Sequence, residues 1–198
     1  MSRQVFPFSI LQDGKPSKGL VELSLVNSNT LRVKIAPDTE SLSKQQMLSE
    51  LVVFPQLTVD PLYSSAEQMR SEHLNIALSE NGLSISTAEG ELLRVAQTAF
   101  KQQGDDSALS QRFISSGEQA FYGLGQYPDG IFNYQEQSRE ICQSNKGIAA
   151  PLLLSTKGYA VLWNQLAFTQ FTSQGEGFSF SSAAGECIEF YVIYGPEF

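Results

Sequence analysis

The chain has 198 residues, of which 41% are hydrophobic, 17% charged and 11% aromatic. This composition is typical of a soluble globular protein and excludes an intrinsically disordered chain. The formal net charge is −8 and the basic residues form no cluster, which argues against nucleic acid as a partner because an acidic surface repels phosphate. No apolar run reaches about 18 residues, so the sequence predicts no membrane-spanning helix and no membrane as a partner.

Short alternating runs separated by turn residues predict β-strands in the first half of the chain. The predicted strands cover residues 20–26, 30–36, 74–78, 83–87 and 91–96. The first two flank Asn27-Ser28-Asn29 and the next two flank Asn81-Gly82, and both arrangements are typical of hairpins. Residues 39–50 fit a helix or a polar loop equally well, and residues 61–72 are predicted to be irregular.

The second half of the chain contains a long loop followed by closely spaced strands. The predicted strands cover residues 110–114, 119–122, 148–154, 159–163, 166–171, 177–181 and 187–194. Residues 123–147 are dense in Gly, Pro, Asp and Asn and have no period, so we interpret them as a loop, and loops of this length are often functional. The absence of alternating strands and helices excludes a Rossmann or complete barrel architecture. We therefore predict an all-β, antiparallel sandwich that forms one domain over residues 1–198.

Few residues suit catalysis or metal binding. The one histidine, His73, lies beside Glu72 in a polar stretch and is interpreted as a surface residue. Cys142 and Cys187 have no metal-type spacing, so both are read as free thiols and no metal site or cofactor is predicted. The motif Gly123-Leu124-Gly125 lacks the helix of a dinucleotide site, so these glycines are expected to serve a turn or a close approach.

The loop also holds acidic and aromatic side chains. Asp129, Glu136 and Glu140 have no spacing that marks a catalytic pair, and solvated loop acids are the preferred interpretation. The rings of Tyr127, Phe132 and Tyr134, with Trp163 on a later strand, suit either sugar stacking or ordinary packing, and packing is favoured.

One stretch carries information beyond its physical pattern. Residues 121–164 read FYGLGQYPDGIFNYQEQSREICQSNKGIAAPLLLSTKGYAVLWN. This segment resembles the signature of glycoside hydrolase family 31, which contains α-glucosidases and α-xylosidases. The flanks agree, because Glu118-Gln119-Ala120 precedes the segment and EFYVIYGPEF is similar to the strand that leads towards the family's catalytic barrel. Asn164-Gln165 departs from the Asp-Asn or Asn-Asn of many members.

The resemblance implies an N-terminal β-sandwich of the galactose-mutarotase-like kind, followed in the parent enzyme by a (β/α)8 barrel. In that family two barrel aspartates perform retaining hydrolysis of terminal α-glucosides or α-xylosides, which requires carboxyl groups about 5 Å apart. This chain is therefore expected to have no catalytic residue and no activity alone. Its expected partners are its own catalytic barrel and, through the parent enzyme, a carbohydrate substrate.

The resemblance also implies that a loop of this domain shapes the sugar pocket. The matching segment here covers residues 138–147, in which Asn145 and Gln143 carry amides able to bind sugar hydroxyl groups. For Asn145 this role and a role in holding the loop backbone are equally supported, whereas the backbone role is favoured for Gln143.

Two other functions stay open at this point. A stand-alone carbohydrate-binding module would use an exposed platform of Tyr127, Phe132 and Tyr134, and a structural interaction domain would only pack on another chain through an apolar patch. The N-terminus shows no secretory signal pattern, which favours a cytoplasmic over a secreted protein.

Overall fold

The computed structural model describes residues 3–44, 59–65, 67–80, 82–104 and 106–195. Within these residues the fold consists almost entirely of β-strands, with the short helix α1 (Thr39–Ser43). The strands are β1 (Gln4–Gln12), β2 (Lys15–Asn27), β3 (Thr30–Ala36), β4 (Tyr63–Ser64), β5 (Gln68–Arg70), β6 (Asn75–Ser79), β7 (Gly82–Thr87), β8 (Gly90–Gln103), β9 (Asp106–Ile114), β10 (Phe121–Gln126), β11 (Ser138–Ile141), β12 (Ile148–Ser155), β13 (Tyr159–Trp163), β14 (Thr169–Gln174), β15 (Gly177–Ser182) and β16 (Ile188–Tyr194).

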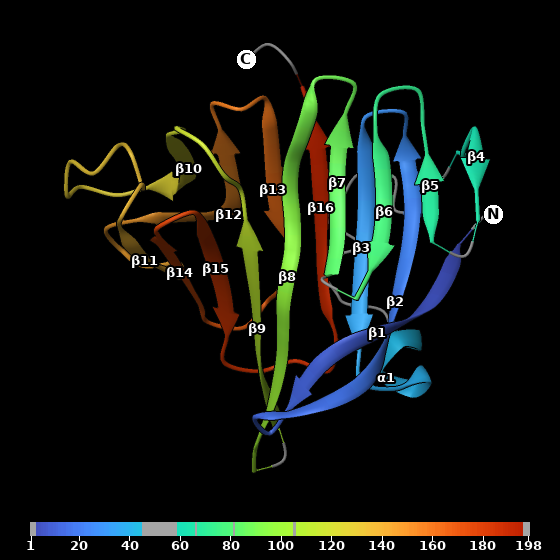
Figure 1. The fold of residues 1–198 in the computed structure, drawn as a ribbon. Helices are drawn as coiled ribbons and strands as arrows, with labels where there is room; N and C mark the ends of the chain where they lie inside the picture. Colours follow the sequence, from blue (N-terminus) through green and yellow to red (C-terminus); the bar gives the residue numbers. More distant parts are fainter. Residues whose placement is uncertain (1–2, 45–58, 66, 81, 105, 196–198) are drawn as a thin grey trace.

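The strands form two stacked layers (Figure 1). The first layer has the order β10-β12-β13-β16-β3-β2-β1, and the second has the order β11-β14-β15-β9-β8-β7-β6-β5-β4. All neighbours within the layers are antiparallel, whereas β1 joins the layers through a short parallel contact of Leu11 and Gln12 with Ala99 and Phe100 of β8. The predicted all-β sandwich is confirmed, and this contact makes its two layers one continuous hydrogen-bonded sheet.

Aromatic rings from opposite layers fill the space between them. Trp163 of β13 stacks on Phe180 of β15 with centroids 5.2 Å apart, and its Nε1 donates a hydrogen bond to Ser182 Oγ. Phe113 of β9 meets Phe190 of β16 edge to face at 5.0 Å. These side chains are buried. Contacts of this kind favour one fixed arrangement of the two layers, because ring pairs prefer particular stacked or edge-on geometries.

The outer face of the first layer buries charged groups that are paired. Arg32 Nε donates to Glu189 Oε1 over 3.0 Å, and Asn164 and Tyr191 also donate to this oxygen. Lys34 Nζ donates to the carbonyl oxygen of Leu42 over 2.6 Å and so holds the end of α1. Buried charges persist when such partners compensate for the loss of water.

Several predicted elements differ from the structure. For residues 39–50, where helix and polar loop were left open, the structure shows the helix α1 only as far as Ser43, and residues 45–50 lie outside the described part. No strand was predicted over the residues of β1. Its Pro7 is tolerated because β8 pairs with β1 only at Leu11 and Gln12 and leaves the edge at Pro7 without a partner strand among the described residues. Residues 61–72 include the paired strands β4 and β5, so the irregular interpretation was wrong there.

The predicted loop over residues 123–147 is also partly wrong, because β10 continues to Gln126 and β11 forms within the loop. Gly123 and Gly125 have positive φ at a register shift between β10 and β12. A Cβ atom on either residue would lie 2.3 Å or less from a carbonyl oxygen of β12. The close approach expected for these two glycines is therefore confirmed. Both cysteines are free thiols, as predicted.

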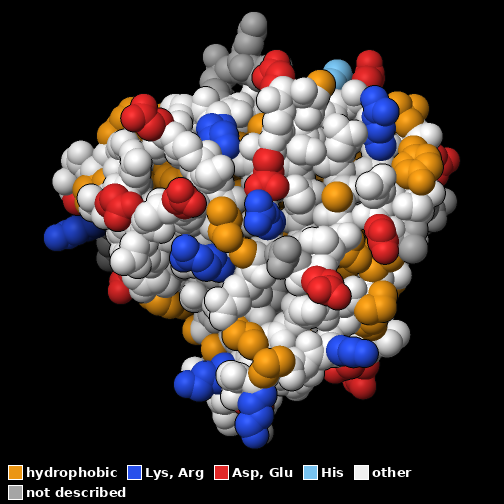
Figure 2. Space-filling model, in the orientation of Figure 1, with side chains coloured by type: hydrophobic (Ala, Val, Ile, Leu, Met, Phe, Trp, Pro, Cys, Tyr) orange, Lys and Arg blue, Asp and Glu red, His pale blue; other side chains and the backbone are white. Residues whose placement is uncertain are grey.

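Among the described residues, no helix has the length and apolar character needed to cross a membrane. On the face shown in Figure 2, Lys and Arg side chains alternate with Asp and Glu and form no continuous basic stripe.

Candidate functional site

The connection between β10 and β12 folds against one side of the sandwich, where it is drawn in yellow and gold (Figure 1). Its strand β11 pairs with β14, which extends the second layer. The Tyr134 backbone N–H donates to the Phe121 carbonyl over 2.8 Å, and Glu136 Oε1 accepts from the backbone N–H of Gly175 over 2.8 Å. The connection is thus attached at several points on either side of the turn at residues 144–147, in which residues 144–146 are exposed.

This turn closes a hollow of about 420 Å³. One wall consists of Gln126, Tyr127 and Pro128, and the other runs from Gln143 to Ile148. Ser144 and Gly147 exchange backbone hydrogen bonds of 3.3 and 3.4 Å, which place Asn145 at the tip of the turn. The hollow is large enough for one sugar ring, since small-ligand sites of about 300 Å³ and above are common.

The two residues predicted to bind sugar line the same hollow but differ in what their side chains do. Gln143 Oε1 accepts from the backbone N–H of Ala149 over 3.2 Å, so it holds the loop as the backbone interpretation expected. Asn145 is exposed, and its side-chain amide has no hydrogen-bond partner among the residues that the structure describes. Asn145 therefore has both a donor and an acceptor available for a ligand.

Arg139 of β11 packs against Tyr127, which lines this hollow. Its guanidinium lies 4.3 Å from the centroid of the Tyr127 ring and 5.3 Å from that of Tyr134, and it forms an ion pair of 2.5 Å with Asp129. This ion pair holds the pKa of Asp129 below its usual range. Burial of the Tyr127 ring raises the pKa of that phenol. Arg139 was missed by sequence reasoning; opposite charges at 129 and 139 beside two tyrosines were the available signal.

The loop carboxylates are not arranged as a catalytic pair. Asp129 is bound to Arg139, Glu136 accepts the hydrogen bond from Gly175, and Glu140 is exposed on β11. Each of these acids therefore either makes its own structural contact or is exposed to solvent. Among the described residues, no group of three His, Cys, Asp or Glu side chains could hold a metal ion. His73 lies at the surface 3.9 Å from Glu72, away from this loop.

The aromatic residues do not form a platform. Trp163 and Tyr134 are buried, and the Tyr127 ring is covered by Arg139. Only Phe132 of this set is strongly exposed, at 80%, and its ring contacts that of Tyr122 with centroids 5.2 Å apart. The three-ring surface required by a stand-alone carbohydrate-binding module is therefore absent, because Tyr134 packs into the core.

These features define an all-β sandwich domain with a long, anchored loop that presents amides at one end. No family model matches the chain. Over 196 residues it is 24% identical to an α-xylosidase of Saccharolobus solfataricus, covering 88% of this chain and 26% of the relative. It is 25% identical over 92 residues to an uncharacterized family 31 glucosidase of Pseudescherichia vulneris, covering 46% of this chain and 17% of the relative.

Solved structures share the fold. A glycoside hydrolase family 31 α-xylosidase from a soil metagenome, complexed with xylose, has a TM-score of 0.77 at 17% identity and covers 98% of this chain and 32% of its own. A family 31 dextranase of Flavobacterium johnsoniae, complexed with isomaltotriose, has a TM-score of 0.67 at 15% identity and covers 100% of this chain and 26% of its own. In sequence and in fold the chain therefore resembles the N-terminal β-sandwich domain of family 31 enzymes. It spans about a quarter to a third of the length of the Saccharolobus α-xylosidase and of the two solved structures.

Proposed function

We propose that this domain acts as the N-terminal accessory domain of a retaining α-glycosidase that hydrolyses terminal α-glucosides or α-xylosides. In this role the sandwich supports the catalytic barrel, and the loop over residues 138–147 contributes to recognition of the terminal sugar. The observation that carries the proposal is the free Asn145 amide at the tip of an anchored turn. A rigid polar group of this kind discriminates well between sugars, because a ligand without the matching hydroxyl leaves it unpaired.

The catalytic carboxylates belong to the proposed barrel. Retaining hydrolysis needs one carboxylate to attack the anomeric carbon while a second, about 5 Å away, protonates the leaving oxygen. The loop acids do not meet this requirement, since Asp129 and Glu136 are engaged in structural contacts. We therefore expect the 198-residue chain to hydrolyse neither α-glucosides nor α-xylosides when it is purified alone.

The first test is the reading frame of the natural gene beyond codon 198. The proposal expects a barrel with two suitably placed aspartates, and a stop codon at position 199 would count heavily against it.

The second test uses the complete gene product with Asn145→Ala. Loss of a neutral hydrogen bond to substrate is expected to raise KM about twofold to tenfold for p-nitrophenyl α-xyloside or α-glucoside. Gln135→Ala removes an exposed amide on the same connection but outside the hollow; it is the matched control and is expected to leave KM unchanged. If both variants have the KM of the unaltered enzyme, Asn145 does not contact the sugar.

A further inference from the structure

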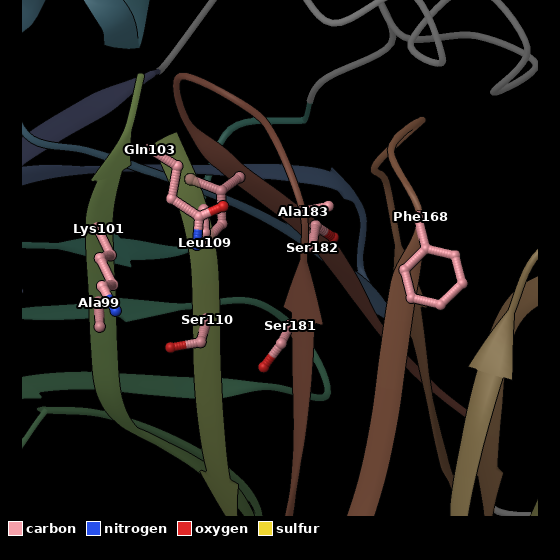
Figure 3. Close-up of a pocket in the computed structure, with 10 residues that line it drawn as sticks. Ala99, Lys101, Gln103, Leu109, Ser110, Phe168, Ser181, Ser182 and Ala183 are labelled. Carbon is pink, nitrogen blue, oxygen red and sulfur yellow. The ribbon is translucent and has the colours of Figure 1, made fainter. Parts of the chain in front are cut away.

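A groove separate from the hollow at the loop lies on the outer face of the second layer. It is found where β8, β9 and β15 run side by side (Figure 3). Its volume is about 410 Å³, within the range of small-ligand sites. Besides the buried Ser182, which is hydrogen-bonded to Trp163, the polar lining residues are Lys101 and Gln103 of β8, Ser110 of β9 and Ser181 of β15. Phe168, just before β14, completes one side. The sequence had predicted a strand from residue 166, but β14 begins at Thr169, which leaves Phe168 in a connection.

Strand register explains why these side chains share one face. Ser110 is paired with Ala99 of β8 on one side and with Ser181 of β15 on the other. Ser181 is in turn paired with Gln170 of β14. Residues paired across neighbouring strands point to the same side of a sheet, so this row spans four strands, or about 14 Å. A row of this length fits more than one sugar ring.

The polar groups in the groove are available to a ligand. The side chains of Lys101, Gln103, Ser110 and Ser181 have no hydrogen bond or ion pair within the part of the chain that the structure describes. Together they offer hydroxyl, amide and ammonium groups. Thr172, on the neighbouring row of the same face, differs because its hydroxyl accepts a hydrogen bond from Ser138.

Phe168 supplies an apolar surface beside these polar groups. Its side chain is 46% exposed, and Figure 3 shows its ring on the far side of Ser181 from Ser110. The same residue lines a second hollow of about 300 Å³ that also contains Gln143. The groove therefore adjoins the region of the proposed sugar-recognition loop. An exposed ring beside free hydroxyl and amide groups suits a ligand whose rings carry both C–H faces and hydroxyl groups.

We propose that this groove binds a neutral oligosaccharide of at least two sugar units. The inference rests on the proposed function and extends it, because it assigns the parent enzyme a longer glycan than a terminal sugar alone. A polyanionic ligand is disfavoured because the net charge is −8 and because Lys101 is the one charged side chain among the described residues that line the groove.

The test is a titration of the 198-residue chain with isomaltotriose, followed by amide chemical shifts in two-dimensional NMR. Saturable shifts are expected at Ser110, Ser181 and Phe168. Phe168→Ala is expected to raise the dissociation constant about fivefold to tenfold. Phe132→Ala removes another exposed ring, which lies outside the groove, and is expected to leave the constant unchanged. Spectra of both free variants verify that the fold is retained.

The outcomes separate this proposal from the proposed function. Shifts confined to residues 143–147 and abolished by Asn145→Ala would overturn the groove while supporting the recognition loop. The groove would also be overturned by an absence of saturable shifts, or by equal effects of the two Phe variants. In those cases the proposed function is tested separately, by the downstream gene sequence and by the KM of Asn145→Ala. Xylose and glucose are expected to bind more weakly than isomaltotriose, because a monosaccharide fills only part of the row.

Discussion

The Cζ atom of Arg139 lies over the Tyr127 ring, 4.3 Å from its centroid, and Gly147 packs against the same ring. Asp129 fixes the other side of Arg139 through an ion pair. Asp129, Arg139, Tyr127 and Gly147 therefore form a continuous support for the turn that carries Asn145. We therefore expect the position of the exposed Asn145 amide to depend on this support.

Arg139→Lys tests whether this support depends on the planar guanidinium or on charge alone. Lysine retains the charge beside Asp129 but loses the planar contact with the tyrosine ring, so we expect a loss of about 0.5–1 kcal/mol in the free energy of unfolding. Urea unfolding measures it. Arg112→Lys, at an exposed position on β9, is the matched control and is expected to have almost no effect. Equal stabilities of the two variants would contradict the role of the stacked ring.

Gly147→Ala tests the close packing of the turn on Tyr127. An added Cβ would lie 2.7 Å from Tyr127 Cδ1, so the ring or the turn must shift. We expect a loss of about 1–3 kcal/mol in the free energy of unfolding, which is the usual cost of overpacking. Lys146→Ala, next to it and exposed, is expected to change stability by less than about 0.5 kcal/mol. A Gly147→Ala protein as stable as the unaltered chain, with unchanged Tyr127 shifts, would refute the contact.

The carboxyl group of Asp129 is expected to titrate below its ordinary pKa of 3.8, because Arg139 stabilises its charged form. A lowered pKa in the folded state means that the stabilisation is present above the unfolded value and is lost as pH falls through the folded value. The midpoint of the Asp129 titration is measured by carbon NMR of its carboxyl group between pH 2 and pH 6, a range of about four units around the ordinary pKa. In Arg139→Gln the midpoint is expected to rise. An unchanged midpoint would show that the ion pair does not form in solution.

Tyr159 gives the opposite pH dependence. Burial raises the pKa of its phenol to about 12, from an ordinary value of 10. The unfolded chain therefore loses this proton first, and stability is expected to fall as pH rises from 10 towards 12, by up to about 1.4 kcal/mol per pH unit from this residue. Tyr159→Phe is expected to show a shallower decline, measured by urea unfolding at pH 9, 10 and 11, that is, across about the ordinary tyrosine pKa. Parallel declines in both proteins would contradict the assignment.

Trp163 is the single tryptophan of the chain, and it is fully buried between the layers. If residues 1–198 form one domain, its fluorescence and the far-UV circular dichroism of the strands are expected to change at the same urea concentration. Two separated midpoints would instead indicate two independently unfolding parts.

Local pattern was sufficient for the secondary structure and for some special positions. Residues 30–36 and 159–163 coincide with β3 and β13. The first segment alternates polar and apolar side chains with the two-residue period of a strand, and the second is a short apolar and aromatic run bounded by turn residues. Gly123 and Gly125 were predicted to serve a turn or a close approach because no helix pattern follows them, and glycine is the residue that most easily adopts the positive φ that both show in the structure. The resemblance of residues 121–164 to the family signature likewise needed no coordinates.

The sequence by itself determined that alternating side chains face opposite sides of each strand, and hence that the chain is an all-β sandwich. Only the tertiary structure decided which distant strands lie side by side, such as β1 with β8 and β9 with β15. That choice buries Tyr134, seats Arg139 on Tyr127 and brings Ser110 beside Ser181. The physical reason is that a two-residue period specifies the face of a side chain but not its neighbour, which packing and register across the whole core select.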